Sequence, residues 1–254
     1  MPTSAPSVDR HPGQRARRAW LVLIVAAAAA PGIGFAQSCS SDGQLRPLAL
    51  RERFISADCA ACWTNPATRA APPRTLALDW IVPGLRGEEA PLSAAANRDG
   101  LARLKALARA VPEGSDVVEN PLLAAARTLR VAHGPAFNDY IAVSIELKPA
   151  GTGAWSAWLA LVETLPAGTE GSPVERHLVR NLYQPAWDGR RQPTRAEQKR
   201  LVATRPMRIP EGVQPQRLSV VGWVQDARGR VRAIARSKCV PQPEPEAVNP
   251  IPPR

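Results

Sequence analysis

Alternating apolar and polar positions predict two short β-strands near the start of the chain, over residues 48–55 and 75–82. Between them, residues 64–74 contain three prolines, which exclude a helix longer than one turn. After the second strand, apolar residues at helical spacing predict a helix from a cap at Asp99 to about Ala110. The order strand, loop, strand, helix predicts an α/β unit over residues 37–125.

The pattern changes after Pro121, where six strand-like runs follow one another without a helix between them. Asp226–Gly229 has the composition of a hairpin turn between the last two runs. This succession predicts an antiparallel β-sandwich over residues 126–239. A polar connection is expected over 188–200, and the proline-rich tail 240–254 is expected to be disordered. The six runs are 128–131, 140–147, 157–165, 177–183, 218–225 and 231–236.

The amino terminus has the three parts of a secretory signal peptide. A basic stretch over 10–18 precedes an apolar core over 20–30, and small residues end at Ala36. Residues 1–36 are therefore predicted to be a cleaved signal, and the mature protein to be periplasmic or secreted. An uncleaved membrane anchor is the alternative. Arg17-Arg18 leaves both the general and the twin-arginine export routes open.

The formal net charge of +11 falls to about +8 once the charges of residues 1–36 are removed. A surplus of this size suits nucleic acid or an anionic surface. The arginines are scattered, however, and no basic run is interleaved with aromatic residues. We therefore expect a solvated basic surface and no nucleic-acid partner.

Four cysteines are present, and three complete pairings are possible. The spacing favours a disulfide between Cys59 and Cys62, because two intervening residues let the side chains meet at a turn. Cys39 and Cys239 are then left as a structural pair that joins the start of the mature chain to its last strand. By loop entropy, such a long-range bond contributes about 4–5 kcal/mol.

A Cys-x-x-Cys pair after a strand is typical of thiol–disulfide exchange proteins. On this interpretation Cys59 is the catalytic nucleophile, Cys62 resolves the mixed disulfide and Trp63 shields the pair. Two features oppose it, since no helix is recognisable at Cys62 and the carboxylate of Asp58 disfavours a thiolate beside it. A purely structural disulfide therefore stays open, and so does an envelope binding or scaffold protein without catalysis.

Copper or zinc binding is a further alternative, because two cysteines with a distant histidine, His133 or His177, form a possible ligand set. The sequence contains no phosphate-binding loop, nucleophile elbow or zinc-protease motif. Trp63 follows Cys62, so the haem-attachment motif is absent as well. No cofactor is expected, and the partner is an unidentified envelope protein or thiol substrate.

Four stretches resemble a family of secreted bacterial proteins of unknown function. Members of that family join a thioredoxin-like amino-terminal domain to a carboxyl-terminal β-sandwich. Phe54–Cys62 is similar to the family's strand and Cys-x-x-Cys opening, and Leu76–Trp80 to its second strand. Gly168–Asn181 resembles its glycine-rich hairpin and polar strand, and Val220–Asp226 its closing hairpin.

The resemblance implies an α+β protein made of a thioredoxin-like unit followed by an antiparallel β-sandwich. Pro66, Pro72 and Pro73 occupy the place of the family's first helix, so the thioredoxin-like unit is expected to be reduced. With the cysteine pair, the resemblance implies a periplasmic protein that carries out thiol–disulfide exchange.

Overall fold

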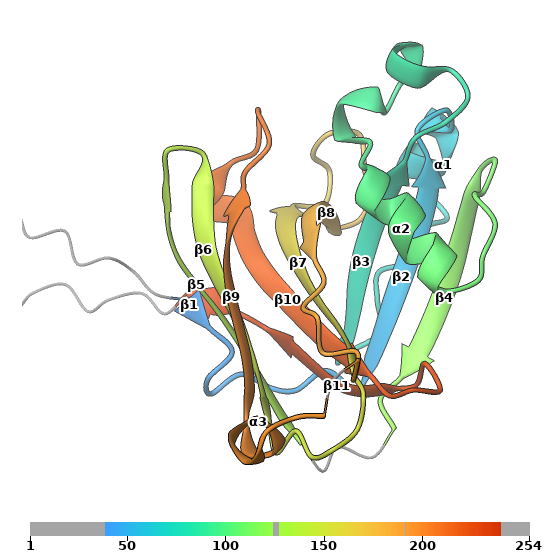
Figure 1. Cartoon of the computed structure of the whole chain (residues 1–254). Helices are drawn as coiled ribbons and strands as arrows, with labels where there is room; N and C mark the ends of the chain where they lie inside the picture. The colour runs from blue at the N-terminus through green and yellow to red at the C-terminus, as the bar shows by residue number, and fades with distance from the viewer. Residues whose placement is uncertain (1–38, 124–126, 191, 240–254) are drawn as a thin grey trace, which may run out of the picture. The chain divides into compact units, whose positions relative to one another are not determined.

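The computed structural model describes residues 39–123, 127–190 and 192–239, which fold into two β-sheets with few helices (Figure 1). The predicted signal segment 1–36 and the predicted tail 240–254 lie outside the described residues. In the part of the chain that is described, no helix is long and apolar enough to span a membrane.

The smaller sheet has five strands in the order β12-β1-β5-β6-β9, and every neighbouring pair is antiparallel. It brings the two ends of the described chain together, because the short strands β1 and β12 pair with each other at one edge. Its strands are β1 (Cys39–Ser40), β5 (Thr128–Phe137), β6 (Tyr140–Lys148), β9 (Leu201–Arg208) and β12 (Lys238–Cys239).

The larger sheet has seven strands in the order β11-β10-β7-β8-β3-β2-β4. It is mixed, since β3 is parallel to both β2 and β8, whereas the other pairs are antiparallel. Its strands are β2 (Ala49–Ser56), β3 (Thr75–Val82), β4 (Ser115–Pro121), β7 (Ser156–Leu165), β8 (Arg176–Tyr183), β10 (Leu218–Gln225) and β11 (Val231–Arg236).

The helices are short: α1 (Ala60–Thr64), α2 (Arg98–Ala106) and α3 (Arg195–Lys199), with 3₁₀ turns η1 (Gly87–Glu89), η2 (Ser93–Ala95) and η3 (Pro215–Arg217). Helix α2 begins one residue before the predicted cap, because the side chain of Asn97 accepts a hydrogen bond from the Asp99 N–H at 2.7 Å. A capping box of Thr194 and Glu197 starts α3 in the segment predicted to be an irregular connection.

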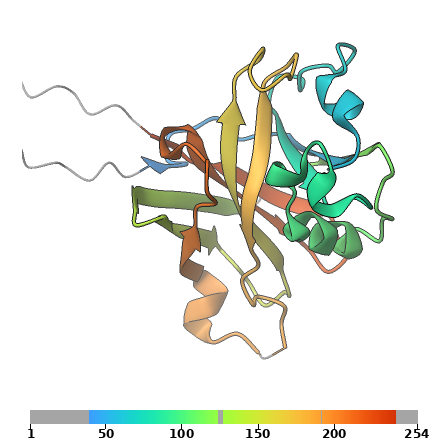
Figure 2. The ribbon, with the colours of Figure 1, turned by 90° about the horizontal axis from the view of Figure 1, so that it is seen from above.

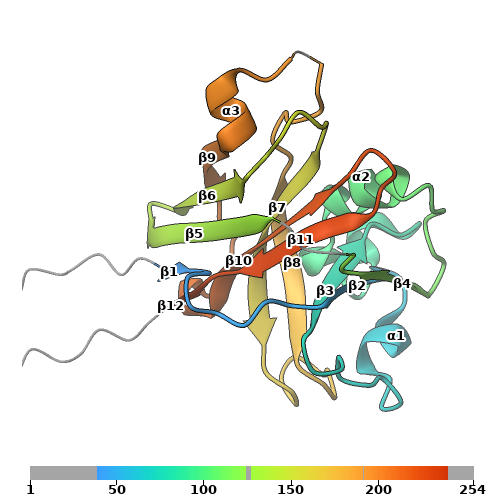
Figure 3. The same cartoon turned by 90° about the horizontal axis from the view of Figure 1, so that it is seen from below.

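The core lies between the sheets and continues behind the larger one. Apolar residues of β5 and β6 pack against β7, β10 and β11. A side chain on Gly222 of β10 would clash with Val131 of the facing sheet, so glycine is required there. A second cluster joins the other face of β7 and β10 to β2, β3 and Leu104 of α2. In Figures 2 and 3, β5 and β6 lie on one side of β7 and β10, while α2 lies on the other.

The predicted thioredoxin-like α/β unit is wrong. Residues 37–125 contribute helices of five and nine residues, too short to cover a sheet of their own. Their strands β2, β3 and β4 instead extend the larger sheet through the parallel pairing of β3 with β8. The six strands predicted over 126–239 are present, but they are divided between two sheets. The predicted domain boundary at 125/126 is not a structural boundary, because the larger sheet contains strands from both sides of it.

Candidate functional site

The structure contains two disulfides, Cys39–Cys239 and Cys59–Cys62, which are the pairings that the spacing favoured. They differ in setting. Cys39 is buried, with 3% of its surface exposed, and its bond ties β1 to the edge strand β12. Cys59 and Cys62 are both half-buried and lie beside the exposed residues Ala60 and Ala61. Of the two disulfides, only Cys59–Cys62 therefore lies in an exposed turn.

Strand β2 positions the Cys59–Cys62 disulfide by ending just before it. Ala57 is buried and its backbone hydrogen-bonds to Val82 and Leu92, which fixes where the chain leaves the sheet. Cys59 then caps α1, and the Cys62 N–H lies 3.2 Å from Cys59 Sγ and donates to it. A short helix therefore does start at the pair, contrary to the sequence interpretation. This hydrogen bond would stabilise a thiolate at Cys59 in the reduced form.

Asp58, which opposed a thiolate in the sequence, has its own partners. Its carboxylate oxygens accept hydrogen bonds from the backbone N–H of Leu85 at 2.7 Å and of Arg86 at 3.3 Å. The absence of a side chain at Gly84 makes room for this carboxylate. Asp58 therefore fixes the loop after β3, and part of its charge is compensated by two backbone donors.

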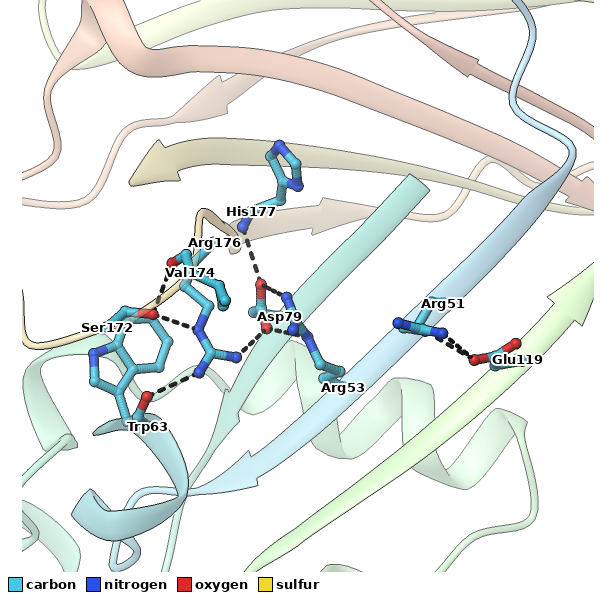
Figure 4. Close-up of polar contacts among 9 residues, drawn as sticks. All are labelled: Arg51, Arg53, Trp63, Asp79, Glu119, Ser172, Val174, Arg176 and His177. Atoms are coloured by element: carbon cyan, nitrogen blue, oxygen red, sulfur yellow. Dashed lines mark hydrogen bonds and ion pairs between the residues drawn. The ribbon is translucent and has the colours of Figure 1, made fainter. Parts of the chain in front are cut away.

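Trp63 anchors α1 to the larger sheet. It is 5% exposed, its indole Nε1 donates to the Glu170 carbonyl at 2.7 Å, and Cys62 packs beside it in the same apolar cluster. The guanidinium of Arg176 lies 4.7 Å from the Trp63 ring and donates to the Trp63 carbonyl at 2.8 Å (Figure 4). The turn that carries the disulfide is thus held by β8.

Asp79 of β3 is the centre of a buried polar network that Arg176 links to Trp63 (Figure 4). Its side chain is fully buried and forms ion pairs with Arg53 at 2.7 Å and Arg176 at 3.2 Å. It also accepts a hydrogen bond from the backbone N–H of His177 at 3.0 Å. Arg176 donates further to Ser172 Oγ at 2.8 Å. Asp79 therefore links β2, β3 and β8 next to Arg176, the residue that contacts Trp63.

His177 follows Arg176 in the chain, and its imidazole is uncharged. Burial, first, and the nearby charges of Arg236 and Arg53 lower the pKa of His177 from 6.5 to about 3. Arg236 lies 2.9 Å and Glu175 lies 3.1 Å from His177 Nε2, and a backbone hydrogen bond with Ala77 opposes the lowering of the His177 pKa. Burial also lowers the pKa of His133, so both imidazoles stay uncharged, each with a single N–H, in the folded protein at neutral pH.

The depressed pKa values predict an acid-sensitive stability. Unfolded histidine titrates near 6.5, so as the pH falls below that value the unfolded chain binds a proton that folded His177 does not. The free energy of unfolding should therefore drop by roughly 3 kcal/mol between pH 6.5 and 4. Urea titrations across this range should show that the free energy of unfolding of His177→Gln depends less steeply on pH than that of the wild type. The same measurement on His133→Gln gives the contribution of His133 to this pH dependence. A slope unchanged in both variants would contradict the prediction.

A second buried network lies on the α2 side of the larger sheet. Arg103, 1% exposed, donates from Nε and Nη2 to the two carboxylate oxygens of Glu52 at 2.8 and 2.7 Å. Its guanidinium also lies 4.8 and 5.2 Å from the rings of Trp158 and Trp223. Gln225 completes the network by accepting from Arg103 and from the Trp158 indole. Neither network was identified from the sequence.

An open hollow of about 810 Å³ lies between the chain before β2 and the end of β11. Glu175 supplies the one carboxylate among its lining residues. Arg236, which bonds to Ser219, Thr164 and His177, forms no ion pair with a carboxylate within the described ranges. The lining of the hollow therefore carries a net positive charge. Its cationic lining residues are Arg46, Arg74, Arg217, Arg236 and Lys238.

The structure separates the histidines from Cys59 and Cys62. Within residues 39–123, 127–190 and 192–239, the group of potential metal ligands that lie close together is Cys39, His133 and Cys239, and it includes neither member of the Cys-x-x-Cys pair. In comparisons with known proteins, no family model, curated protein or solved structure matches the chain. The site is therefore interpreted from its own geometry.

Proposed function

We propose that the protein exchanges disulfides with thiol substrates through Cys59 and Cys62, after export to an oxidising compartment. The observation that carries the proposal is the setting of this pair: a half-exposed disulfide whose Cys62 N–H donates to Cys59 Sγ. Arg176 donates to the Trp63 carbonyl and lies over the Trp63 ring, so the backbone of the turn is supported from outside the disulfide. Disulfide bonds persist in such compartments, which favours this location.

The exchange has two steps. A substrate thiolate attacks Cys59 Sγ, the Cys59–Cys62 bond breaks, and Cys62 leaves as a thiolate. A second substrate thiol then attacks the mixed disulfide, which gives a substrate disulfide and two cysteine thiols. Two electrons and two protons pass from the substrate to the pair, and the reverse sequence reduces a substrate disulfide.

Substitution of the resolving cysteine tests the order of attack. In Cys62→Ser, Cys59 remains as a free nucleophile and should accumulate as a mixed disulfide with a small disulfide such as oxidised glutathione. Mass spectrometry should find this adduct in most of the Cys62→Ser chains and in far fewer Cys59→Ser chains. Equal adduct in the two variants, or none in either, would exclude Cys59 as the attacking residue.

The hollow favours a second candidate function, which is the binding of an anionic ligand that has an apolar part. Its lining combines arginines with Leu45, Leu76 and Leu218, and its five cationic residues face the single carboxylate of Glu175. This activity would need no chemistry at the cysteines.

A matched pair of probes tests the binding function. A straight-chain carboxylate should raise the melting temperature of the protein by a few degrees, whereas the alcohol of equal chain length should not. Arg236→Gln should abolish the effect of the carboxylate. If both probes act alike, or if the variant responds like the wild type, the hollow is not an anion site.

A further inference from the structure

Cys239, Cys39 and His133 lie in one row across three neighbouring strands. Cys39 of β1 is the register partner of Cys239 of β12 on one side and of His133 of β5 on the other. Residues directly opposite each other in a sheet project their side chains to the same face. The two sulfur atoms and a ring nitrogen of His133 accordingly lie within 4.8 Å of one another.

The imidazole of His133 is arranged as a metal ligand is. The residue is 7% exposed, and its Nδ1 lies 3.0 Å from the Gly134 carbonyl. A carbonyl only accepts, so Nδ1 carries the proton and Nε2 carries the lone pair. Nε2 is buried and has no hydrogen-bond partner in the described part of the chain. Metal-bound histidines commonly donate their other N–H to a carbonyl in this way.

We propose that Cys39, Cys239 and His133 bind one Cu(I) ion when the Cys39–Cys239 bond is reduced. Two thiolates and an imidazole form a soft donor set that suits Cu(I). A structural zinc site would need a fourth protein ligand, and the close group within the described residues has three members. The site is independent of Cys59 and Cys62 and of the function proposed for them.

The oxidation state of the pair decides whether the site exists. In the structure the two sulfur atoms are bonded to each other, so neither is a thiolate ligand. A dithiol reductant supplies two electrons and two protons to this bond and is itself oxidised to a disulfide. Binding of Cu(I) then displaces one proton from each cysteine. The site is thus present before the pair is oxidised, or after a dithiol has reduced it.

Access is from the hollow described above. Cys239 is half-buried and belongs to the lining of the hollow together with Ser237 and Lys238. Cys39 and His133 lie behind it and are nearly fully buried. A reductant therefore reaches Cys239 first, and the ion enters along the same side.

The test is a copper titration of the full chain carrying Cys59→Ser and Cys62→Ser, so that the other pair cannot bind the ion. The protein is reduced with a phosphine under anaerobic conditions and titrated with Cu(I) against a chromophoric Cu(I) chelator. We expect one Cu(I) per chain, and none in the oxidised protein. Cys39→Ser should weaken binding at least 100-fold and His133→Gln at least tenfold. X-ray absorption should show two sulfur donors and one nitrogen donor.

Three results would overturn the proposal. One is an unchanged affinity in His133→Gln, and another is equal binding by the oxidised protein. The third concerns folding, followed by circular dichroism on the same samples: a reduced chain that is unfolded and stays unfolded after Cu(I) is added contains no such site. Retention of Zn(II) in place of Cu(I) in a direct competition would likewise contradict the assignment of the ion.

Discussion

Asp79→Asn is expected to lower the free energy of unfolding by about 3–5 kcal/mol, because it leaves two buried guanidinium groups without their carboxylate. Asparagine keeps the shape of the side chain and removes its charge. Arg53 and Arg176 are 7% and 1% exposed, so water cannot replace the lost partner. Chemical denaturation measures the loss, and hydrogen exchange should show faster opening of α1, because Arg176 holds Trp63.

A surface ion pair on the neighbouring strands provides the matched control. Glu119 of β4 lies 2.6 Å from Arg51 of β2, and the Glu119 side chain is 56% exposed (Figure 4). Glu119→Gln removes a charge from an equally close pair and should cost less than about 1 kcal/mol. If Asp79→Asn destabilises no more than Glu119→Gln does, the buried network does not support the disulfide turn.

Arg103→Met should be destabilising to a similar degree, about 3–5 kcal/mol, because Glu52 would be left buried and unpaired. Glu52 has no exposed surface, and both of its oxygens accept from Arg103. Methionine keeps a long apolar side chain at this position but removes the guanidinium that lies over the rings of Trp158 and Trp223. The measured loss therefore reports the lost charge and hydrogen bonds together with these cation–π contacts.

A double substitution separates the contribution of the Arg103–Glu52 ion pair from that of the residues around it. Adding Glu52→Gln to Arg103→Met removes the stranded charge, so more than half of the lost stability should return. Near-ultraviolet circular dichroism should show the two tryptophans regaining a fixed environment. A double variant whose loss equals the sum of the two single losses would show that Arg103 and Glu52 are not coupled.

The sequence predicted eight of the twelve strands in the described residues and missed β1, β4, β9 and β12. β3 and β7 show clear apolar patterns because neighbours cover them on both sides. β4 and β9 lie at the outer edges of their sheets, and much of each is exposed. Few apolar positions are needed there, and a proline such as Pro206 is tolerated at an edge, so alternation is weak.

The order of the strands within the two sheets could not be predicted from the local pattern of apolar and polar residues. Whether β2 and β3 form their own domain or extend another sheet depends on the pairing of β3 with β8, which is about 100 residues further along the chain. Alternation along a strand identifies its buried face but not its neighbour. For this reason the α/β pattern predicted a separate unit over residues 37–125, which the family resemblance further identified as thioredoxin-like.

The cysteine pairings were predictable because two residues between Cys59 and Cys62 suffice to bring the sulfurs together. The buried networks were not, since Asp79 and Arg176 are far apart in the sequence. The sequence does contain one indication of the buried networks. Glu52, Arg53 and Asp79 are charged residues inside strands that also contain buried apolar residues, and such charged residues are seldom buried without partners.

The most direct test of the proposed exchange is a redox titration of the purified protein with a graded dithiol buffer. Free thiols are alkylated at each potential, and mass spectrometry identifies which cysteines are modified. We predict that Cys59 and Cys62 become reduced together at potentials above about −270 mV, whereas Cys39–Cys239 stays intact until below about −300 mV. Reduction of Cys59–Cys62 only at or below the potential of Cys39–Cys239 would show that both bonds are structural, and would contradict the proposed function.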